Sequence, residues 1–415
     1  MGMIIIFCLA LVALALGLWR ALGALALNNP VFSLGLVDSF GLAMILGGLY
    51  WGVVANPDTV ILEPLLAINL FCGALVFILF FFIMPDNIGE AKLTGWKLFL
   101  IPLLLFPGFF FWASSPPFLC ALCFPEEKGT GRGLFTVVAL VFFSLAAGLF
   151  GSGIWERHSP LSHRYIGDIS IFLSVALGLW LWMRRPPRDT EEMPLRFFPV
   201  KSLGYWTGDK IYGQELLVYS RVKRTLTPSS FIGSVAAGGL VQLSLGTKLP
   251  WKETYACEPV ILVLVTLGLG ALLWGPLIAS FTPPMTTLAL NSLVLSFFLL
   301  GPLKPDGNLS YELTLSLAPL LCAGALVPLY LRVGVSRHDF LPYSLGKMDI
   351  FLVSGFFLGG SLSFLYTAKP IFHLATTTIL GILALASAAL AAGPSLSWTV
   401  PLILTAGIGL LYYTL

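Results

Sequence analysis

Apolar segments long enough to cross a membrane recur along almost the whole chain. A helix needs about 20 consecutive apolar residues to cross the hydrocarbon core of a bilayer, and such segments occur throughout the 415 residues. Only 10% of the residues are charged, whereas a soluble domain carries roughly 25%. The chain therefore lacks the polar surface of a soluble protein. We expect an all-α, polytopic integral membrane protein.

The spacing of these segments predicts about 13 transmembrane helices, with about 12 to 14 as the range. The segment 229–247 is the weakest, because it is rich in Gly, Ser and Thr. Its "AAGG" sequence would allow a neighbouring helix to approach closely. The predicted spans are residues 3–27, 32–54, 59–84, 97–118, 133–154, 165–183, 229–247, 258–281, 284–302, 311–333, 348–367, 371–392 and 397–414.

A polar segment at 184–228 divides the chain. Loops rich in Lys and Arg stay on the cytoplasmic side, so we expect this basic loop, and the N-terminus six spans earlier, on that side of a bacterial or organellar inner membrane. We predict an N-terminal bundle of six helices in 1–183 and a C-terminal bundle of about seven in 229–415. No internal repeat between the halves is recognisable. Candidates for contact with lipid headgroups or partner proteins are Arg184, Arg185, Arg188, Arg221, Lys223 and Arg224.

Few polar side chains that could carry transport lie within the predicted spans. Arg20 and Asp38 lie at equal depth on two consecutive antiparallel helices, which predicts a structural ion pair or a proton or solute site. Glu63 is followed by Pro64, and Asn69 comes a turn and a half later. A carboxylate beside a proline break can serve ion coupling, but near a helix start it can equally be stabilised by the helix dipole.

Nothing in the sequence predicts a catalytic or metal centre. Cys120 and Cys123 form an isolated CxxC that no second pair completes, so packing at a helix end is the preferred interpretation over zinc or redox chemistry. No haem or metal site is evident, and no clustered acid and base predicts an enzyme. The basic residues lie in short loops, so we expect membrane lipids rather than nucleic acid as partners.

The region from about 215 to 345 resembles the heel membrane subunit of respiratory complex I and energy-converting hydrogenases. Glu215 precedes Pro228 by 13 residues, "GGLVQ" follows at 238–242, and a later helix opens with "SYE" at 310–312. Thr227 replaces the family's glycine, and the acidic loop that shapes its quinone chamber is missing. The resemblance implies a scaffold or ion-path subunit beside a redox subunit, with other membrane subunits as partners and quinone as a conceivable cofactor.

Three classes of function remain open from the sequence. The resemblance favours an integral membrane subunit of a multi-subunit energy-converting complex, with a role in electron transport or proton translocation. The helix count, the central loop and the proline breaks favour a secondary transporter of a small solute or ion. A lipid-handling enzyme or flippase is the third class.

Overall fold

The computed structural model is helical throughout the residues that it describes, and these contain no strand. This confirms the all-α expectation. The described residues are 2–28, 30–54, 62–83, 97–113, 115, 127–158, 215–246, 258–281, 284–300, 309–334, 341–367 and 371–392, with single positions between 169 and 183.

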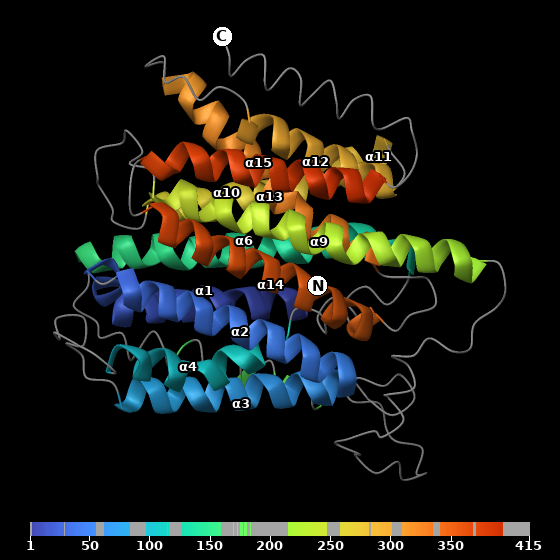
Figure 1. Cartoon of the computed structure of the whole chain (residues 1–415). Helices are drawn as coiled ribbons and strands as arrows, with labels where there is room; N and C mark the ends of the chain where they lie inside the picture. Colours follow the sequence, from blue (N-terminus) through green and yellow to red (C-terminus); the bar gives the residue numbers. More distant parts are fainter. Residues whose placement is uncertain are drawn as a thin grey trace, which may run out of the picture.

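Five long helices are described before the basic segment, and each covers one predicted span (Figure 1). Pro30 opens the second of them, at a helix position where a missing backbone N–H has no cost. The five helices are α1 (Gly2–Asn28), α2 (Pro30–Val54), α3 (Leu62–Ile83), α4 (Lys97–Ala113) and α6 (Glu127–His158).

The described helices after the basic segment form a second set. The first begins at Glu215, so the end of the segment predicted as loop 184–228 is helical, and Pro228 lies inside the helix. The eighth predicted span contains a π-helical turn. The elements are α9 (Glu215–Gly246), α10 (Glu258–Leu269), η3 (Gly270–Trp274), α11 (Gly275–Phe281), α12 (Pro284–Leu300), α13 (Leu309–Gly334), α14 (Leu341–Thr367) and α15 (Ile371–Ala392).

Eleven of the predicted spans coincide with described helices, including the uncertain span 229–247. Of the span predicted at 165–183 only single helical positions are described, and 397–414 lies outside the described residues. The total of about 13 therefore stays a prediction.

The outer surface of the described helices is apolar. Phe82, Leu103 and Leu273 expose between 60% and 78% of their surface, which suits lipid and would be unfavourable in water. Apolar windows of 18 residues or more occur at Phe135–Ser152 and Val260–Ala279, and eight other described helices carry shorter apolar runs.

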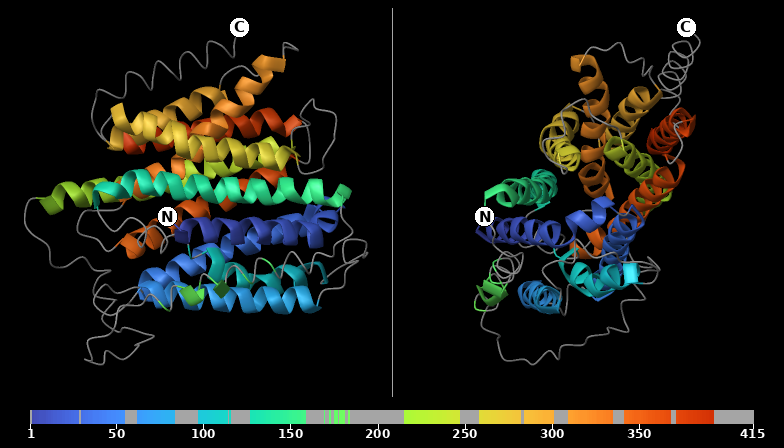
Figure 2. Two further views of the ribbon diagram at one scale, coloured as in Figure 1. Left: turned by 180° about the vertical axis from the view of Figure 1, so that it is seen from behind. Right: turned by 90° about the vertical axis from the view of Figure 1, so that its left-hand side faces the viewer.

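Three helix contacts recur in the two helix sets. In the first set α1 packs on α6, while α2 and α3 both pack on α4; in the second, α9 packs on α14, while α10 and α12 both pack on α13. Thus α1, α2, α3, α4 and α6 correspond in order to α9, α10, α12, α13 and α14. The sets meet where α2 packs on α14 and α6 packs on α10 (Figure 2). The repeat escapes the sequence because lipid-facing and core positions both require only apolar residues.

Glycines set a close helix crossing between α9 and α14. A β-carbon at Gly238 would lie 1.8 Å from the Phe356 carbonyl oxygen, and one at Gly359 would lie 1.9 Å from the Val235 carbonyl oxygen. The two backbones touch directly, as in membrane helix pairs joined by small residues. The expected close neighbour of the "AAGG" sequence is therefore α14.

Candidate functional site

Asp38 is the one formally charged residue whose side chain lies within the described part of the structure. It lies on α2, and its Oδ1 atom accepts a hydrogen bond of 2.9 Å from Ser361 Oγ on α14. Both side chains are half-buried. Because α2 and α14 belong to different helix sets, this bond joins the two sets across their junction.

Aromatic packing surrounds this bond. The rings of Phe40 and Phe357 lie 6.5 Å apart, and the Phe357 ring occupies the space that a side chain at position 41 would fill, since a β-carbon at Gly41 would lie 2.4 Å from Phe357 Cγ. On the other face of α2, Ser39 Oγ donates to the Pro102 carbonyl of α4 at 2.9 Å. Asp38 therefore lies beside a close-packed contact between the two sets.

The ion pair predicted between Arg20 and Asp38 stays a prediction. Arg20 lies on α1, which neighbours α2, but its side chain is outside the described residues. The described partner of Asp38 is Ser361, 323 residues away in sequence. No local pattern could have indicated it, because sequence spacing says nothing about which distant helix packs on α2.

Glu63 and Asn69 both lie on α3, which begins at Leu62. Pro64 is the third described residue of α3, and a proline in the first turn of a helix breaks no intrahelical bond. The described helix is continuous through Pro64, and the side chain of Glu63 is outside the described residues. Asn69 is 0% exposed, and neither of its amide atoms has a hydrogen-bond partner.

Other candidates from the sequence are only partly placed. Arg221, Lys223 and Arg224 lie on α9, with side chains outside the described set. Three further arginines, Arg184, Arg185 and Arg188, lie outside it altogether, as do Cys120 and Cys123. Among the described residues no group of three or more His, Cys, Asp or Glu side chains is arranged to hold a metal ion.

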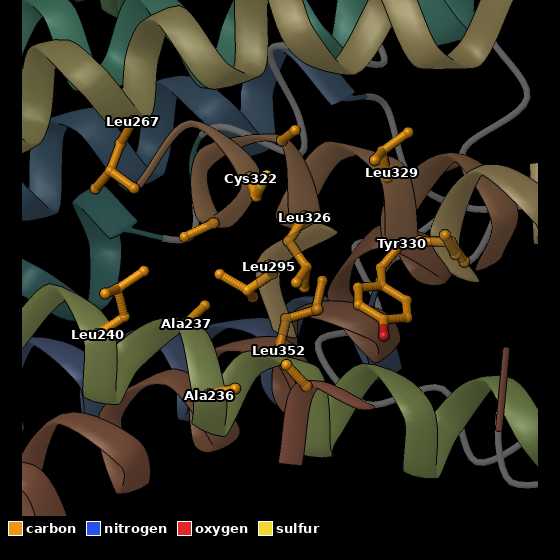
Figure 3. Packing of buried hydrophobic residues seen from close by; sticks show 14 of the residues in the cluster. Ala236, Ala237, Leu240, Leu267, Leu295, Cys322, Leu326, Leu329, Tyr330 and Leu352 are labelled. Carbon is orange, nitrogen blue, oxygen red and sulfur yellow. The ribbon is translucent and has the colours of Figure 1, made fainter. Parts of the chain in front are cut away.

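A cluster of four buried hydroxyl groups joins the second helix set. Tyr330 Oη donates to the Ser229 carbonyl oxygen at 2.8 Å and lies 2.6 Å from Ser387 Oγ. Ser229 Oγ donates to the Ser387 carbonyl oxygen at 2.9 Å, and Ser292 Oγ lies 3.5 Å from Ser387 Oγ. All four residues are completely buried. Figure 3 shows Tyr330 among buried apolar residues, with its hydroxyl oxygen pointing away from α13.

This hydroxyl cluster is a structural connection between α9, α12, α13 and α15. Each hydroxyl has a partner inside the cluster, so the polar groups are satisfied by the protein itself. Gly233 keeps the cluster compact, because a β-carbon there would lie 2.7 Å from Ser387 Oγ and 2.8 Å from Tyr330 Oη. The sequence did not single out these residues; the "PSS" at 228–230 was the available signal.

A second buried polar group lies beside the π-helical turn η3. Trp274 Nε1 donates to Asn291 Oδ1 at 2.9 Å, and Asn291 Nδ2 donates to the Cys322 carbonyl oxygen at 3.0 Å. Asn291 is 0% exposed. π-helical turns occur frequently at functional sites, and this one directs Trp274 onto α12.

The arrangement resembles that of known transporters. One structure of the transporter FucP, in the outward conformation, shares a TM-score of 0.59 and 14% identity with the chain. A second FucP structure, of the Escherichia coli fucose:proton symporter, has a TM-score of 0.59 and 16% identity. The human organic anion transporter MFSD10 has a TM-score of 0.58 and 15% identity. Each covers 94% of this chain and 97% of its own.

The chain has the major facilitator fold. Such coverage at 14–16% identity shows the fold alone, and together with the apolar composition it shows a multi-pass helical membrane protein. No protein-family model and no curated protein matches the sequence.

The major facilitator fold overturns the resemblance to the heel subunit of complex I. Glu215, Pro228 and the "GGLVQ" residues lie on one continuous helix, α9, which packs on α13, α14 and α15. Sequences of long apolar helices can share an order of Gly, Pro and charged residues by chance. Here such a match led to the wrong family prediction. The prediction of a complex subunit is therefore wrong, and the structural neighbours, which are transporters, give no support to its electron-transport role or its membrane-subunit partners.

Proposed function

We propose that this protein is a secondary transporter of a small solute. The observation that carries the proposal is the likeness over 94% of the chain to a fucose:proton symporter and an organic anion transporter. In such transporters two helix sets rock against each other around a central site. The two sets of corresponding helices described above supply the moving parts.

We assign to Asp38 the role of coupling proton movement to solute transport. A charged side chain within a membrane is costly and is by default functional. We propose that Asp38 couples proton movement to transport, with the Ser361 hydroxyl donating a hydrogen bond to its Oδ1 atom across the two helix sets. Because this bond joins α2 to α14, a change in the charge of Asp38 alters the contact between the two helix sets.

Uptake into proteoliposomes with an imposed pH gradient tests the proposal. A panel of labelled neutral sugars and organic anions should contain a solute that accumulates against its gradient. Asp38→Asn keeps an acceptor for Ser361 but cannot carry a proton, so it should lower accumulation at least about tenfold. Ser39→Ala, which alters the neighbouring residue and its bond to α4, should retain accumulation.

Two outcomes contradict the proposal separately. Absence of uptake across the whole panel argues against a transporter of these solutes. Accumulation by Asp38→Asn equal to that of the unaltered protein argues against proton coupling through Asp38.

The remaining topology belongs to the same proposal. The units that move would be the bundles of residues 1–183 and 229–415, connected by 184–228, with the N-terminus and this connection on the cytoplasmic side. Protease cleavage of 184–228 only in inside-out vesicles is the expected result.

A further inference from the structure

Each helix set contains a buried asparagine at the same position of its third helix. Asn69 is the eighth residue of α3 and Asn291 the eighth residue of α12, and these two helices correspond in the packing pattern. Both side chains are 0% exposed. The two asparagines therefore allow a direct comparison of how the protein satisfies a buried amide.

The amide of Asn291 is satisfied by the protein. Its oxygen accepts from Trp274 Nε1 and its nitrogen donates to the Cys322 carbonyl. By contrast, both amide atoms of Asn69 lack a partner, and so does the indole Nε1 of Trp112, which is 4% exposed. A buried polar group without a partner is unfavourable.

Trp112 and Asn69 both lie near Gly73. Trp112, on α4, lies against α3 at this glycine, because a β-carbon at Gly73 would be 2.9 Å from Trp112 Nε1. Asn69 is four residues before Gly73, so their β-positions are about 5–6 Å apart on one face of the helix. The unpaired indole N–H thus lies within about 9 Å of Asn69 Cβ. Phe7 of α1 stacks on Trp112 at 5.5 Å and closes the apolar side.

We propose that Asn69 and Trp112 form a subsite for one neutral hydroxyl group. A hydroxyl oxygen accepts from Trp112 Nε1–H and from Asn69 Nδ2–H, while its hydrogen is donated to Asn69 Oδ1. A carboxylate could not donate to Oδ1, and an ammonium could not accept from the indole. The chemistry therefore selects an uncharged hydroxyl group, from a polyhydroxy solute or from water.

This subsite deepens the proposed transport function and rests on it where the hydroxyl belongs to the solute. The Phe7 and Phe77 rings both pack on the Trp112 ring. The solute class would then be neutral and polyhydroxylated, in contrast to organic anions.

The test compares Asn69→Leu with the matched variant Asn291→Leu in the full-length purified protein. If Asn69 binds a hydroxyl, Asn69→Leu lowers Tm and moves the Trp112 indole N–H resonance upfield in nitrogen-15 spectra, with Trp112→Phe identifying that resonance. Asn291→Leu breaks two known bonds, so it lowers Tm and leaves the Trp112 resonance in place.

Added alcohols distinguish the two sources of the hydroxyl. L-fucose, D-glucose and glycerol are the probes. A solute hydroxyl predicts that at least one probe raises Tm and shifts the Trp112 resonance in the unaltered protein, and that Asn69→Leu loses both effects. Water predicts a hydrogen-bonded Trp112 resonance that no probe shifts.

One combination overturns the subsite. An Asn69→Leu protein at least as stable as the unaltered one, with an unchanged Trp112 resonance, would show that no hydroxyl joins these groups. If Asn69→Leu does not fold, an indole resonance at the non-bonded position in the unaltered protein is decisive by itself. None of these readouts depends on transport. A negative result for the subsite can therefore be told apart from an absence of uptake.

Discussion

Tyr330 shows how a single side chain connects the second helix set. Its hydroxyl bonds to the Ser229 carbonyl and to Ser387 Oγ, and so ties α13 to α9 and α15. Interhelical hydrogen bonds in membrane proteins contribute modestly, because the separated helices also find partners. The importance of the cluster lies in fixing the relative rotation of three helices as much as in its energy.

Removing this hydroxyl gives a prediction at the scale of one residue. Tyr330→Phe keeps the ring and should lower the free energy of unfolding by about 0.5–1.5 kcal/mol, measured by denaturant titration in detergent. Thr266→Val is the control, since the Thr266 hydroxyl bonds only to the Leu262 carbonyl of its own helix at 2.8 Å. An equal loss in the two variants would contradict a connecting role for Tyr330.

Sequence reasoning at this scale found some residues and missed others. Asp38 and Asn69 were predictable because a charge or an amide in an apolar run is rare. Ser229, Ser292 and Ser387 were not, because serine is common in membrane helices and only convergence in space distinguishes these three. The partner of Asp38 was beyond prediction, since Ser361 lies on a helix that only tertiary packing brings near.

At the scale of elements, α9 and α14 are held together by direct backbone contact. Gly355 and Gly359 form a small-residue pair spaced by four, and both face carbonyl oxygens of α9. Such a crossing maximises dispersion contacts, which are the main attraction between helices in lipid. The same residues could not be larger without separating the helices.

Substitution of two adjacent glycines by alanine tests this helix crossing. Gly359→Ala places a β-carbon 1.9 Å from the Val235 carbonyl oxygen and should destabilise the protein by about 1–3 kcal/mol. Gly360→Ala should be nearly neutral, because its closest atom would be the Gly238 carbonyl oxygen at an ordinary 3.7 Å. Thermal unfolding in detergent measures both. A similar Tm for the two variants would argue against the crossing.

At the scale of the whole molecule, the described contacts between the two helix sets include α2 on α14 and α6 on α10. The contact between α2 and α14 carries Asp38, Ser361 and the Phe357 ring. If transport requires these helices to separate, a covalent link between them must stop it. The position of Gly41 against Phe357 offers such a link.

The double variant Gly41→Cys, Phe357→Cys should form a disulfide on oxidation. A β-carbon at Gly41 lies 2.4 Å from Phe357 Cγ, which brings the two β-carbons near the roughly 3.5–4.5 Å of a disulfide. Oxidation should abolish uptake and a reductant should restore it, whereas each single variant should be insensitive to oxidation. Undiminished uptake by the cross-linked protein would mean that α2 and α14 do not separate.

The sequence by itself determined that the chain is helical and membrane-embedded, and where the eleven described spans lie. These properties depend on the hydrophobicity of each segment, which is a local feature of the sequence. The tertiary structure decided which helices pair, that the two sets repeat, and that Asp38 meets Ser361. Those properties depend on small residues and hydroxyls whose partners are distant in sequence. For the same reason the local motifs in 215–345 led to the wrong family, and only the arrangement of the helices in space corrected it.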